Sequence, residues 1–155
     1  MQVLVLDHNL INEDGFAALA SGINRNAALQ SLSLAYCGLG PQSAALLANI
    51  LTPDSVLAVS VMQPSLQFLN LSGNALCGQG LSYLCAGLRR SMSIASINLA
   101  DIGVTVNDLE AIRTLARSMA SNISIAHLDF TRNFIGASFY RVVSDVFKLA
   151  EIRER

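Results

Sequence analysis

Two histidines and three cysteines are the side chains of this 155-residue chain best suited to acid–base or metal chemistry. Histidine titrates near neutral pH, and imidazole and thiolate groups are common protein ligands of zinc. His127 has a carboxylate neighbour, Asp129, two residues further on. Side chains two apart on a strand share one face, so this pair could form a hydrogen bond, but no nucleophile accompanies it. We therefore expect a hydrogen-bonded surface pair.

These side chains must be positioned by a repeated element. Five segments share the pattern LxxLxLxx(N/C)xL, where x is any residue, and they begin near residues 1, 29, 66, 94 and 125. Apolar positions one, four and six predict a short strand, and apolar residues spaced three and four apart after it predict a helix. A repeat of this length is typical of a solenoid, in which each unit buries its apolar face against its neighbours. The chain is therefore expected to form a single α/β domain over 1–155.

The ninth residue of each repeat is expected to form a structural ladder. It is asparagine or cysteine in four repeats, and such a side chain can bond backbone groups of neighbouring turns that would otherwise be buried without a partner. The ladder residues are Asn9, Cys37, Asn74 and Asn133. Ile102 departs from the pattern, so we expect a gap in the ladder at the fourth repeat.

The repeat pattern resembles that of leucine-rich repeat proteins over essentially the whole chain. Steps of 28, 37, 28 and 31 residues between repeat starts, and alternation of asparagine and cysteine at the ninth position, resemble the ribonuclease-inhibitor-like subfamily. This resemblance implies a right-handed β–α superhelix of about five repeats, with a curved parallel sheet inside and helices outside. The same family includes Ran GTPase-activating proteins and the sensor domains of NOD-like receptors.

Such a solenoid separates the groups that could do chemistry. His8 and His127 belong to the first and fifth strands, four strand spacings or roughly 19 Å apart, so they cannot share a metal ion or a proton. Cys37 is a buried ladder residue in this scheme, and metal binding by Cys77 and Cys85 would need further ligands nearby. We therefore expect no metal, no cofactor and no enzymatic activity.

Residues between the buried strand positions face the concave surface, where repeat proteins commonly bind their partners. Most of them here are small and neutral. Aromatic residues and arginine are enriched among binding hot spots, so Phe68 is the best single candidate anchor; alternatively, it packs under a neighbouring residue. The candidate partner-binding residues are Asp7, His8, Ser33, Tyr36, Phe68, Asn70, Asn98, Asp101, His127, Asp129 and Arg132.

Composition excludes several classes of protein. The chain is 52% hydrophobic and 14% charged, with a formal net charge of −1, which excludes disorder and argues against a general electrostatic grip on nucleic acid. No apolar stretch reaches the roughly 18–20 residues of a membrane span. Without a secretory signal, the three cysteines indicate reduced thiols. We expect a cytoplasmic protein or, alternatively, one associated with the cytoskeleton or a flagellum.

Three features leave alternatives open. An apolar insertion within 52–65 either extends a helix-to-strand connection or forms a protruding binding element. Arg89, Arg90, Arg113 and Arg117 mark either a solvated helix face or a contact with an acidic partner or an anionic surface. Because the first strand begins without a cap, we expect that the chain is part of a longer protein or, less favoured, self-associates through this edge.

The expected function is a non-catalytic protein–protein interaction module, or scaffold, whose unidentified partner binds the concave strand face. The resemblance implies two alternatives. One is regulation of a GTPase, as in the Ran activators, and the other is a sensor segment of a NOD-like signalling protein.

Overall fold

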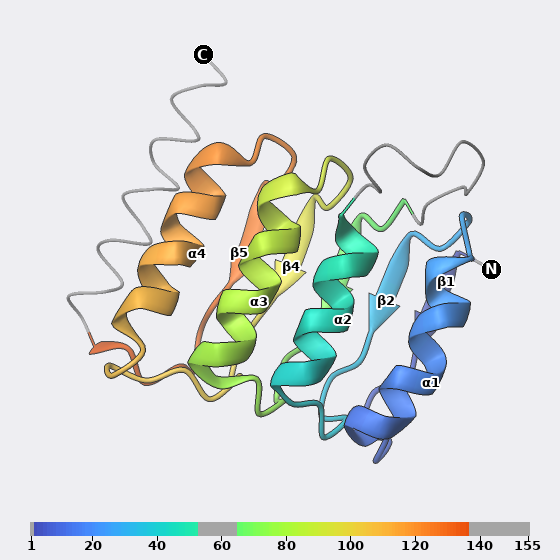
Figure 1. Ribbon diagram of the computed structural model, residues 1–155, viewed down its shortest axis with the longest axis horizontal. Coiled ribbons are helices and arrows are strands. Elements are labelled where there is room, and N and C mark those ends of the chain that lie inside the picture. Colours follow the sequence, from blue (N-terminus) through green and yellow to red (C-terminus); the bar gives the residue numbers. More distant parts are fainter. Residues whose placement is uncertain (1, 53–64, 137–155) are drawn as a thin grey trace.

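Five short strands form one parallel sheet in the computed structural model, which describes residues 2–52 and 65–136. The strands are β1 (Val3–Val5), β2 (Ser31–Ser33), β3 (Phe68–Asn70), β4 (Ser96–Asn98) and β5 (His127–Asp129). They lie side by side in chain order, so each repeat pairs with the next (Figure 1). The register aligns position four of every repeat, because Leu4, Leu32, Leu69, Ile97 and Leu128 face one another in turn. The predicted α/β solenoid of parallel repeats is confirmed.

Four helices cover one face of this sheet and leave the other face open in the described part of the chain (Figure 1). They are α1 (Asn12–Asn24), α2 (Pro41–Leu51), α3 (Cys77–Arg90) and α4 (Leu109–Ser121). Each begins shortly after the strand exit, as the apolar spacing predicts. Residues 53–64 of the predicted insertion lie outside the described residues, so both interpretations of that segment stay predictions.

The core lies between the sheet and the helices and is continuous from repeat to repeat. Strand positions one, four and six and the inward side of each helix contribute to it, as the repeat pattern predicts. Fully buried members include Phe16, Leu32, Leu34, Leu47, Leu69, Leu71, Leu84, Ile97, Leu99, Ile112 and Leu115. The helical stripes thus bury an apolar surface that no single repeat could bury alone.

Helices α2 and α3 approach each other closely because glycine stands at their contact. A β-carbon at Gly87 would lie 2.6 Å from both the Cα and the carbonyl oxygen of Ala48. A β-carbon at Gly80 would lie 3.2 Å from the Cα of Pro41. The backbones of two neighbouring repeats therefore meet without a side chain between them at Gly87.

The loops that lead from strand to helix alternate between two backbone geometries. In repeats one, three and five, the residue at position twelve has a positive φ: Asn12 (58°), Cys77 (55°) and Gly136 (68°). In repeats two and four, the positive φ falls at position ten, on Gly38 (70°) and Gly103 (77°). The same odd repeats carry asparagine at position nine. The two-repeat alternation seen in the sequence is therefore also an alternation of turn geometry.

Candidate partner-binding face

The strand exits are held by polar side chains at position five of the repeats. In repeats three, four and five, the side-chain oxygen of this residue accepts a hydrogen bond from the backbone N–H two residues on, the local pattern that asparagine and aspartate favour in turns. The pairs are Asn70–Ser72 (3.1 Å), Asn98–Ala100 (2.9 Å) and Asp129–Thr131 (3.0 Å). These three predicted binding residues therefore also shape the turn that ends each strand.

Ser33 is buried, with 6% of its surface exposed, so its prediction as a solvent-facing binding residue is wrong. Its hydroxyl donates to Asp7 Oδ1 at 2.7 Å and accepts from Asn70 Nδ2 at 3.0 Å. The same Asp7 oxygen accepts from the backbone N–H of Ala35 at 2.8 Å. The side chains of the neighbouring strands close over this hydroxyl, which joins repeats one, two and three instead of facing a partner.

Four of the predicted binding residues, His8, Tyr36, Asp101 and Arg132, stand in one row at the strand exits. Position eight of all five repeats has a positive φ, between 54° and 68°. Its residues are His8, Tyr36, Gly73, Asp101 and Arg132. A left-handed conformation costs a non-glycine residue about 1–2 kcal/mol, so the surrounding turns must impose it. This row forms one rim of the concave face, and we call it the position-eight row.

Tyr36 is held in this row by both of its neighbours. Its ring stacks on the ring of His8, with centroids 4.9 Å apart and an interplanar angle of 5°. On the other side, the ring lies over Gly73, where any β-carbon would overlap it. Gly73 therefore supplies both the left-handed turn and the space for the ring. The tyrosine remains 43% exposed and ordered by these contacts.

Two hollows open on the concave face beside the aromatic residues. The larger, about 460 Å³, lies between Phe68 and His127 with Ser96 and Asn98 between them. Phe68 is 38% exposed, so it does not pack under a neighbour completely. The smaller hollow, about 210 Å³, lies along the position-eight row. Its lining includes Tyr36, Asn98, Asp101, Asp129 and Arg132.

His127 and Asp129 lie on one face of β5 and are both exposed, but the expected hydrogen bond between them is absent among the described residues. The carboxylate of Asp129 instead accepts two hydrogen bonds from Thr131, one from its hydroxyl at 2.7 Å and one from its backbone N–H. His8 follows the first strand and His127 lies in the fifth, at opposite edges of the sheet. Ser96 lies across from His127 on the neighbouring strand, but in the described residues no hydrogen bond joins either histidine side chain to a serine, threonine or cysteine side chain.

Two of the ladder asparagines each join two repeats. Asn74 Oδ1 accepts from the N–H groups of Cys37 and Leu39, both at 3.0 Å, and its Nδ2 donates to the carbonyls of Leu34 and Leu71, both at 2.8 Å. The donors and acceptors therefore belong to its own repeat and to the preceding one. Asn133 bonds repeats four and five in the same way.

The side chains at the other ladder positions make fewer hydrogen bonds between repeats. Cys37 donates its thiol to the carbonyl of Leu6 at 3.1 Å, and Asn9 bonds only within its own repeat. Ile102 is fully buried among apolar residues and supplies no polar group. Its own backbone N–H is satisfied by Asn133 at 3.1 Å. The gap at residue 102 thus falls between repeats three and four, while repeat four is joined to repeat five.

The three cysteines are free thiols, and two of them are fully buried. Burial raises the pKa of the Cys85 thiol to about 12, against a smaller lowering by a hydrogen bond from Ser118. Burial also raises the pKa of Cys37. Cys77 is exposed. Among the described residues, no group of three or more histidine, cysteine or carboxylate side chains could hold a metal ion.

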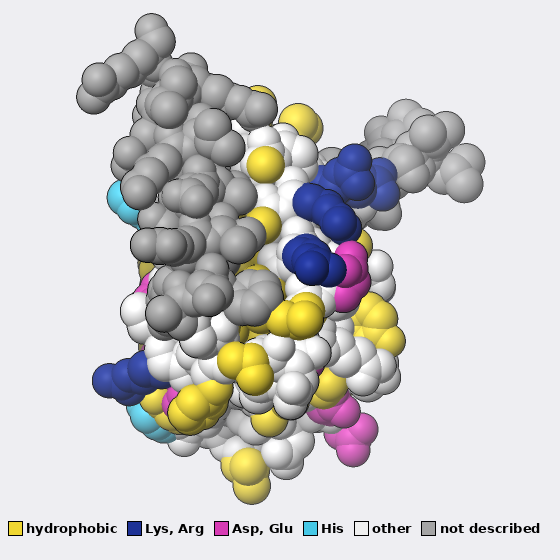
Figure 2. All heavy atoms as spheres, turned by 90° about the vertical axis from the view of Figure 1, so that its left-hand side faces the viewer, with side chains coloured by type: hydrophobic (Ala, Val, Ile, Leu, Met, Phe, Trp, Pro, Cys, Tyr) yellow, Lys and Arg dark blue, Asp and Glu magenta, His cyan; other side chains and the backbone are white. Residues whose placement is uncertain are grey.

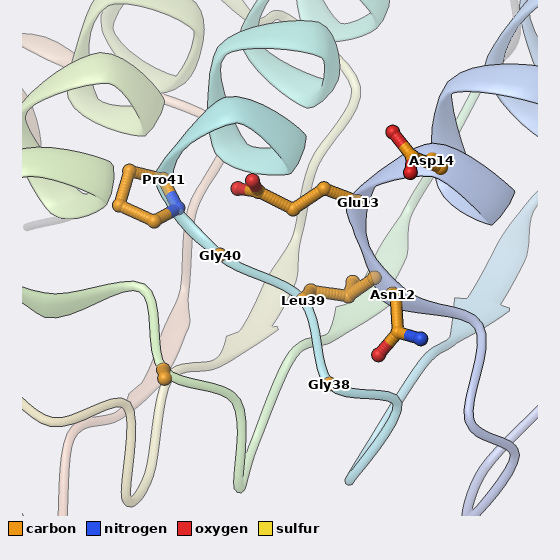
Figure 3. A pocket seen from close by; sticks show the side chains of 8 residues that line it. Asn12, Glu13, Asp14, Gly38, Leu39, Gly40 and Pro41 are labelled. Atoms are coloured by element: carbon orange, nitrogen blue, oxygen red, sulfur yellow. The ribbon is translucent and has the colours of Figure 1, made fainter.

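A third hollow, about 400 Å³, lies on the strand-to-helix side of the solenoid, between the starts of α1 and α2 (Figure 3). Glu13 Oε1 accepts from the backbone N–H of Gln42 at 2.8 Å, at the N-terminus of α2. A carboxylate is favourable there because the first N–H groups of a helix lack partners and carry a partial positive charge. Gly40 leaves the room that this carboxylate occupies. Glu13 therefore joins two repeats as a helix cap.

Within residues 2–52 and 65–136, no helix is both long enough and apolar enough to cross a membrane.

Comparison with known proteins supports the repeat assignment. A family model described as "Leucine Rich repeat" matches residues 63–85. The chain is 33% identical over 109 residues to human NACHT, LRR and PYD domains-containing protein 5, covering 70% of this chain and 8% of that protein. It is 28% identical over 138 residues to mouse ribonuclease inhibitor, covering 88% and 28% respectively. The chain thus spans less than a third of either relative.

Solved structures share the fold at low sequence identity. The structure of "Leiomodin-1 Actin-Binding Site 2 (ABS2)" superposes with a TM-score of 0.76 at 14% identity, covering all of this chain and 83% of that one. The tropomodulin C-terminal domain of Caenorhabditis elegans superposes with a TM-score of 0.72 at 16% identity, covering all of this chain and 87% of that one. The repeat pattern, the five parallel strands and these likenesses together identify the chain as a leucine-rich repeat protein with ribonuclease-inhibitor-like homologues at modest identity.

Proposed function

We propose that this protein is a non-catalytic interaction module that binds a protein partner on the concave face of its sheet. One observation carries the proposal: Phe68 stands 38% exposed beside a hollow of about 460 Å³ on a sheet face that no described helix covers. A partly exposed aromatic residue beside a hollow is a typical anchor point of an interface.

The surroundings of Phe68 favour a preformed surface. Asn70 and Asn98 accept hydrogen bonds from backbone N–H groups and so hold the neighbouring strand exits, and the His8–Tyr36 stack holds the rim. A partner would therefore meet side chains whose positions are already restricted, which lowers the entropy cost of binding.

The placement of reactive groups favours binding over catalysis. The two histidines lie at opposite edges of the sheet, and the thiols of Cys37 and Cys85 are buried. The mouse relative is named ribonuclease inhibitor, and an inhibitor acts by binding. We place the module in the cytoplasm or on the cytoskeleton or flagellum.

Substitution of Phe68 tests the proposal, with a matched control on the other side of the molecule. Tyr83 in α3 is also an aromatic residue with 38% exposure, but it lies on the helical side. Proteins captured from cells by the wild-type chain identify the partner, and purified partner then gives the affinities. We expect Phe68→Ala to weaken binding at least tenfold, equivalent to about 1.4 kcal/mol, and Tyr83→Ala to leave it unchanged. The reverse pattern would move the binding site to the helices.

Actin provides a partner that can be tried without capture, because the leiomodin structure of the same fold is that of an actin-binding site. Co-sedimentation of the chain with actin filaments, together with pull-down of monomeric actin, decides whether this chain binds it. If neither form binds, the partner is another protein, and the concave-face proposal is then tested with the partner captured from cells.

A further inference from the structure

Two aliphatic side chains project from adjacent loops at the edge where the helices return to the strands. Met92 follows α3 and is 78% exposed, and Ile123 follows α4 and is 91% exposed. They occupy equivalent positions in repeats three and four. We call this pair the aliphatic edge. Neither side chain lines any of the three hollows described above.

Hydrogen bonds hold the two loops together. Asn122, only 8% exposed, donates through Nδ2 to the carbonyls of Leu88 and Ser91 at 2.6 and 2.8 Å. Ser124 adds a longer bond to the same Ser91 carbonyl, at 3.4 Å. The loop that carries Met92 is therefore fastened to the loop that carries Ile123, so the aliphatic edge is a fixed feature of the surface.

Positive charge lies directly beside the aliphatic edge. Arg89 and Arg90 form the last turn of α3, immediately before the loop of Met92, and both are exposed. Neither has an ion pair among the residues that the structure describes. Their guanidinium groups are therefore available to an anion.

The charge continues along α4. Arg113 and Arg117 both pair with Glu110, at 3.6 and 3.1 Å, which leaves one net positive charge on this helix. Glu110 belongs to the first turn of α4, at the end away from Ile123. Figure 2 shows basic side chains gathered along the helical side of this end of the molecule.

We propose that the aliphatic edge and its arginines dock on an anionic lipid membrane. Exposed aliphatic side chains gain free energy by entering the boundary between headgroups and acyl chains, and neighbouring basic residues are attracted to anionic headgroups. A shaped protein partner is less favoured because the side chains protrude instead of lining a hollow. This docking leaves the concave sheet face open, so it is independent of the proposed partner-binding function.

Sedimentation of the full chain with vesicles tests the docking. Vesicles of phosphatidylcholine alone are compared with vesicles in which about a third is phosphatidylserine. We expect binding to the anionic vesicles, weakened by added salt, and little binding to the neutral ones. Equal binding to both, or binding to neither, would overturn the proposal.

Matched variants separate the aliphatic and the electrostatic contributions. The double variant Met92→Ser, Ile123→Ser is expected to weaken anionic-vesicle binding about tenfold or more. Leu10→Ser is its control, because Leu10 is 84% exposed but lies in the strand-to-helix loop at the opposite edge. Arg89→Glu with Arg90→Glu is expected to abolish binding, whereas Arg132→Glu, in the position-eight row of the concave face, is expected to have a small effect.

The other possible occupants have distinct outcomes. If the double serine variant leaves vesicle binding unchanged but converts a dimer into a monomer in light scattering, the aliphatic edge is a contact between copies of the chain. If it instead weakens a protein complex, the edge binds protein. Either result contradicts membrane docking. Circular dichroism of every variant verifies that the fold is intact.

Discussion

The contact between α2 and α3 makes a quantitative prediction for a single methyl group. Replacing Gly87 by alanine would place a β-carbon 2.6 Å from two backbone atoms of Ala48. Since backbone atoms cannot rotate away, the two helices must separate. Overpacking of this kind costs about 1–3 kcal/mol. Alanine also recovers about 1 kcal/mol of helix propensity, so the expected net change in the free energy of unfolding is a loss of up to about 2 kcal/mol.

Gly22 provides a matched control within α1. It also stands in the last turns of a helix, but a β-carbon there meets nothing within 4 Å. Gly22→Ala should therefore gain the propensity term alone and stabilise the protein by about 0.5–1 kcal/mol. Because the propensity term is common to both variants, their difference isolates the packing cost of about 1–3 kcal/mol.

Urea unfolding followed by circular dichroism measures both variants against the wild type. The midpoint of unfolding is expected to fall for Gly87→Ala and to rise for Gly22→Ala, with the dependence on urea unchanged in both. Equal stabilisation by the two substitutions would refute the reasoning, because it would mean that α2 and α3 can separate at Gly87 at no cost.

Three other predictions concern single side chains. Asn74→Ala removes the acceptor of two buried backbone N–H groups and is expected to cost about 2–4 kcal/mol in thermal or urea unfolding, whereas Asn9→Ala, exposed and bonded only within its repeat, should cost under about 1 kcal/mol. Under native conditions at about pH 8, a thiol reagent should modify the exposed Cys77 and not the buried Cys85. Because folding raises the pKa of Cys85 from 9.0 to about 12, the contribution of its buried neutral thiol to stability is full below pH 9.0 and is lost as pH rises toward 12. Ser43→Ala should leave stability unchanged or raise it by up to about 1 kcal/mol, because the buried hydroxyl has no hydrogen-bond partner among the described residues.

The repeat frame could be predicted because it depends on contacts that recur in every repeat. Leu4, Leu32 and Leu69 stand at the same position of successive copies, and a parallel sheet in register places them against one another. One apolar pattern therefore determines the strands, the register and the buried face. The five-strand sheet follows from this periodicity alone.

The burial of Ser33 could not be predicted in this way because it depends on which polar side chains the two neighbouring repeats happen to carry. Its hydroxyl is covered by the side chains of Asp7 and Asn70, which come from positions seven and five. The position-eight row is a similar case. Its left-handed backbone falls on glycine only at Gly73, and residue type gives no signal at Tyr36 and Arg132.

The alternation at position nine has a physical reason in the hydrogen bonds between repeats. Each buried asparagine bonds both its own repeat and the preceding one, so one asparagine serves two turns. An even repeat therefore tolerates cysteine or isoleucine at position nine, as at Cys37 and Ile102, because the following asparagine satisfies its backbone N–H.

Photo-crosslinking of the partner complex tests the central claim most directly. A photoreactive amino acid is placed at Phe68 on the concave face or at Tyr83 on the helical side, two positions with the same exposed fraction. The account predicts that the partner is crosslinked from position 68 and not from position 83. Crosslinking from position 83 alone would contradict the claim that the concave sheet face binds the partner.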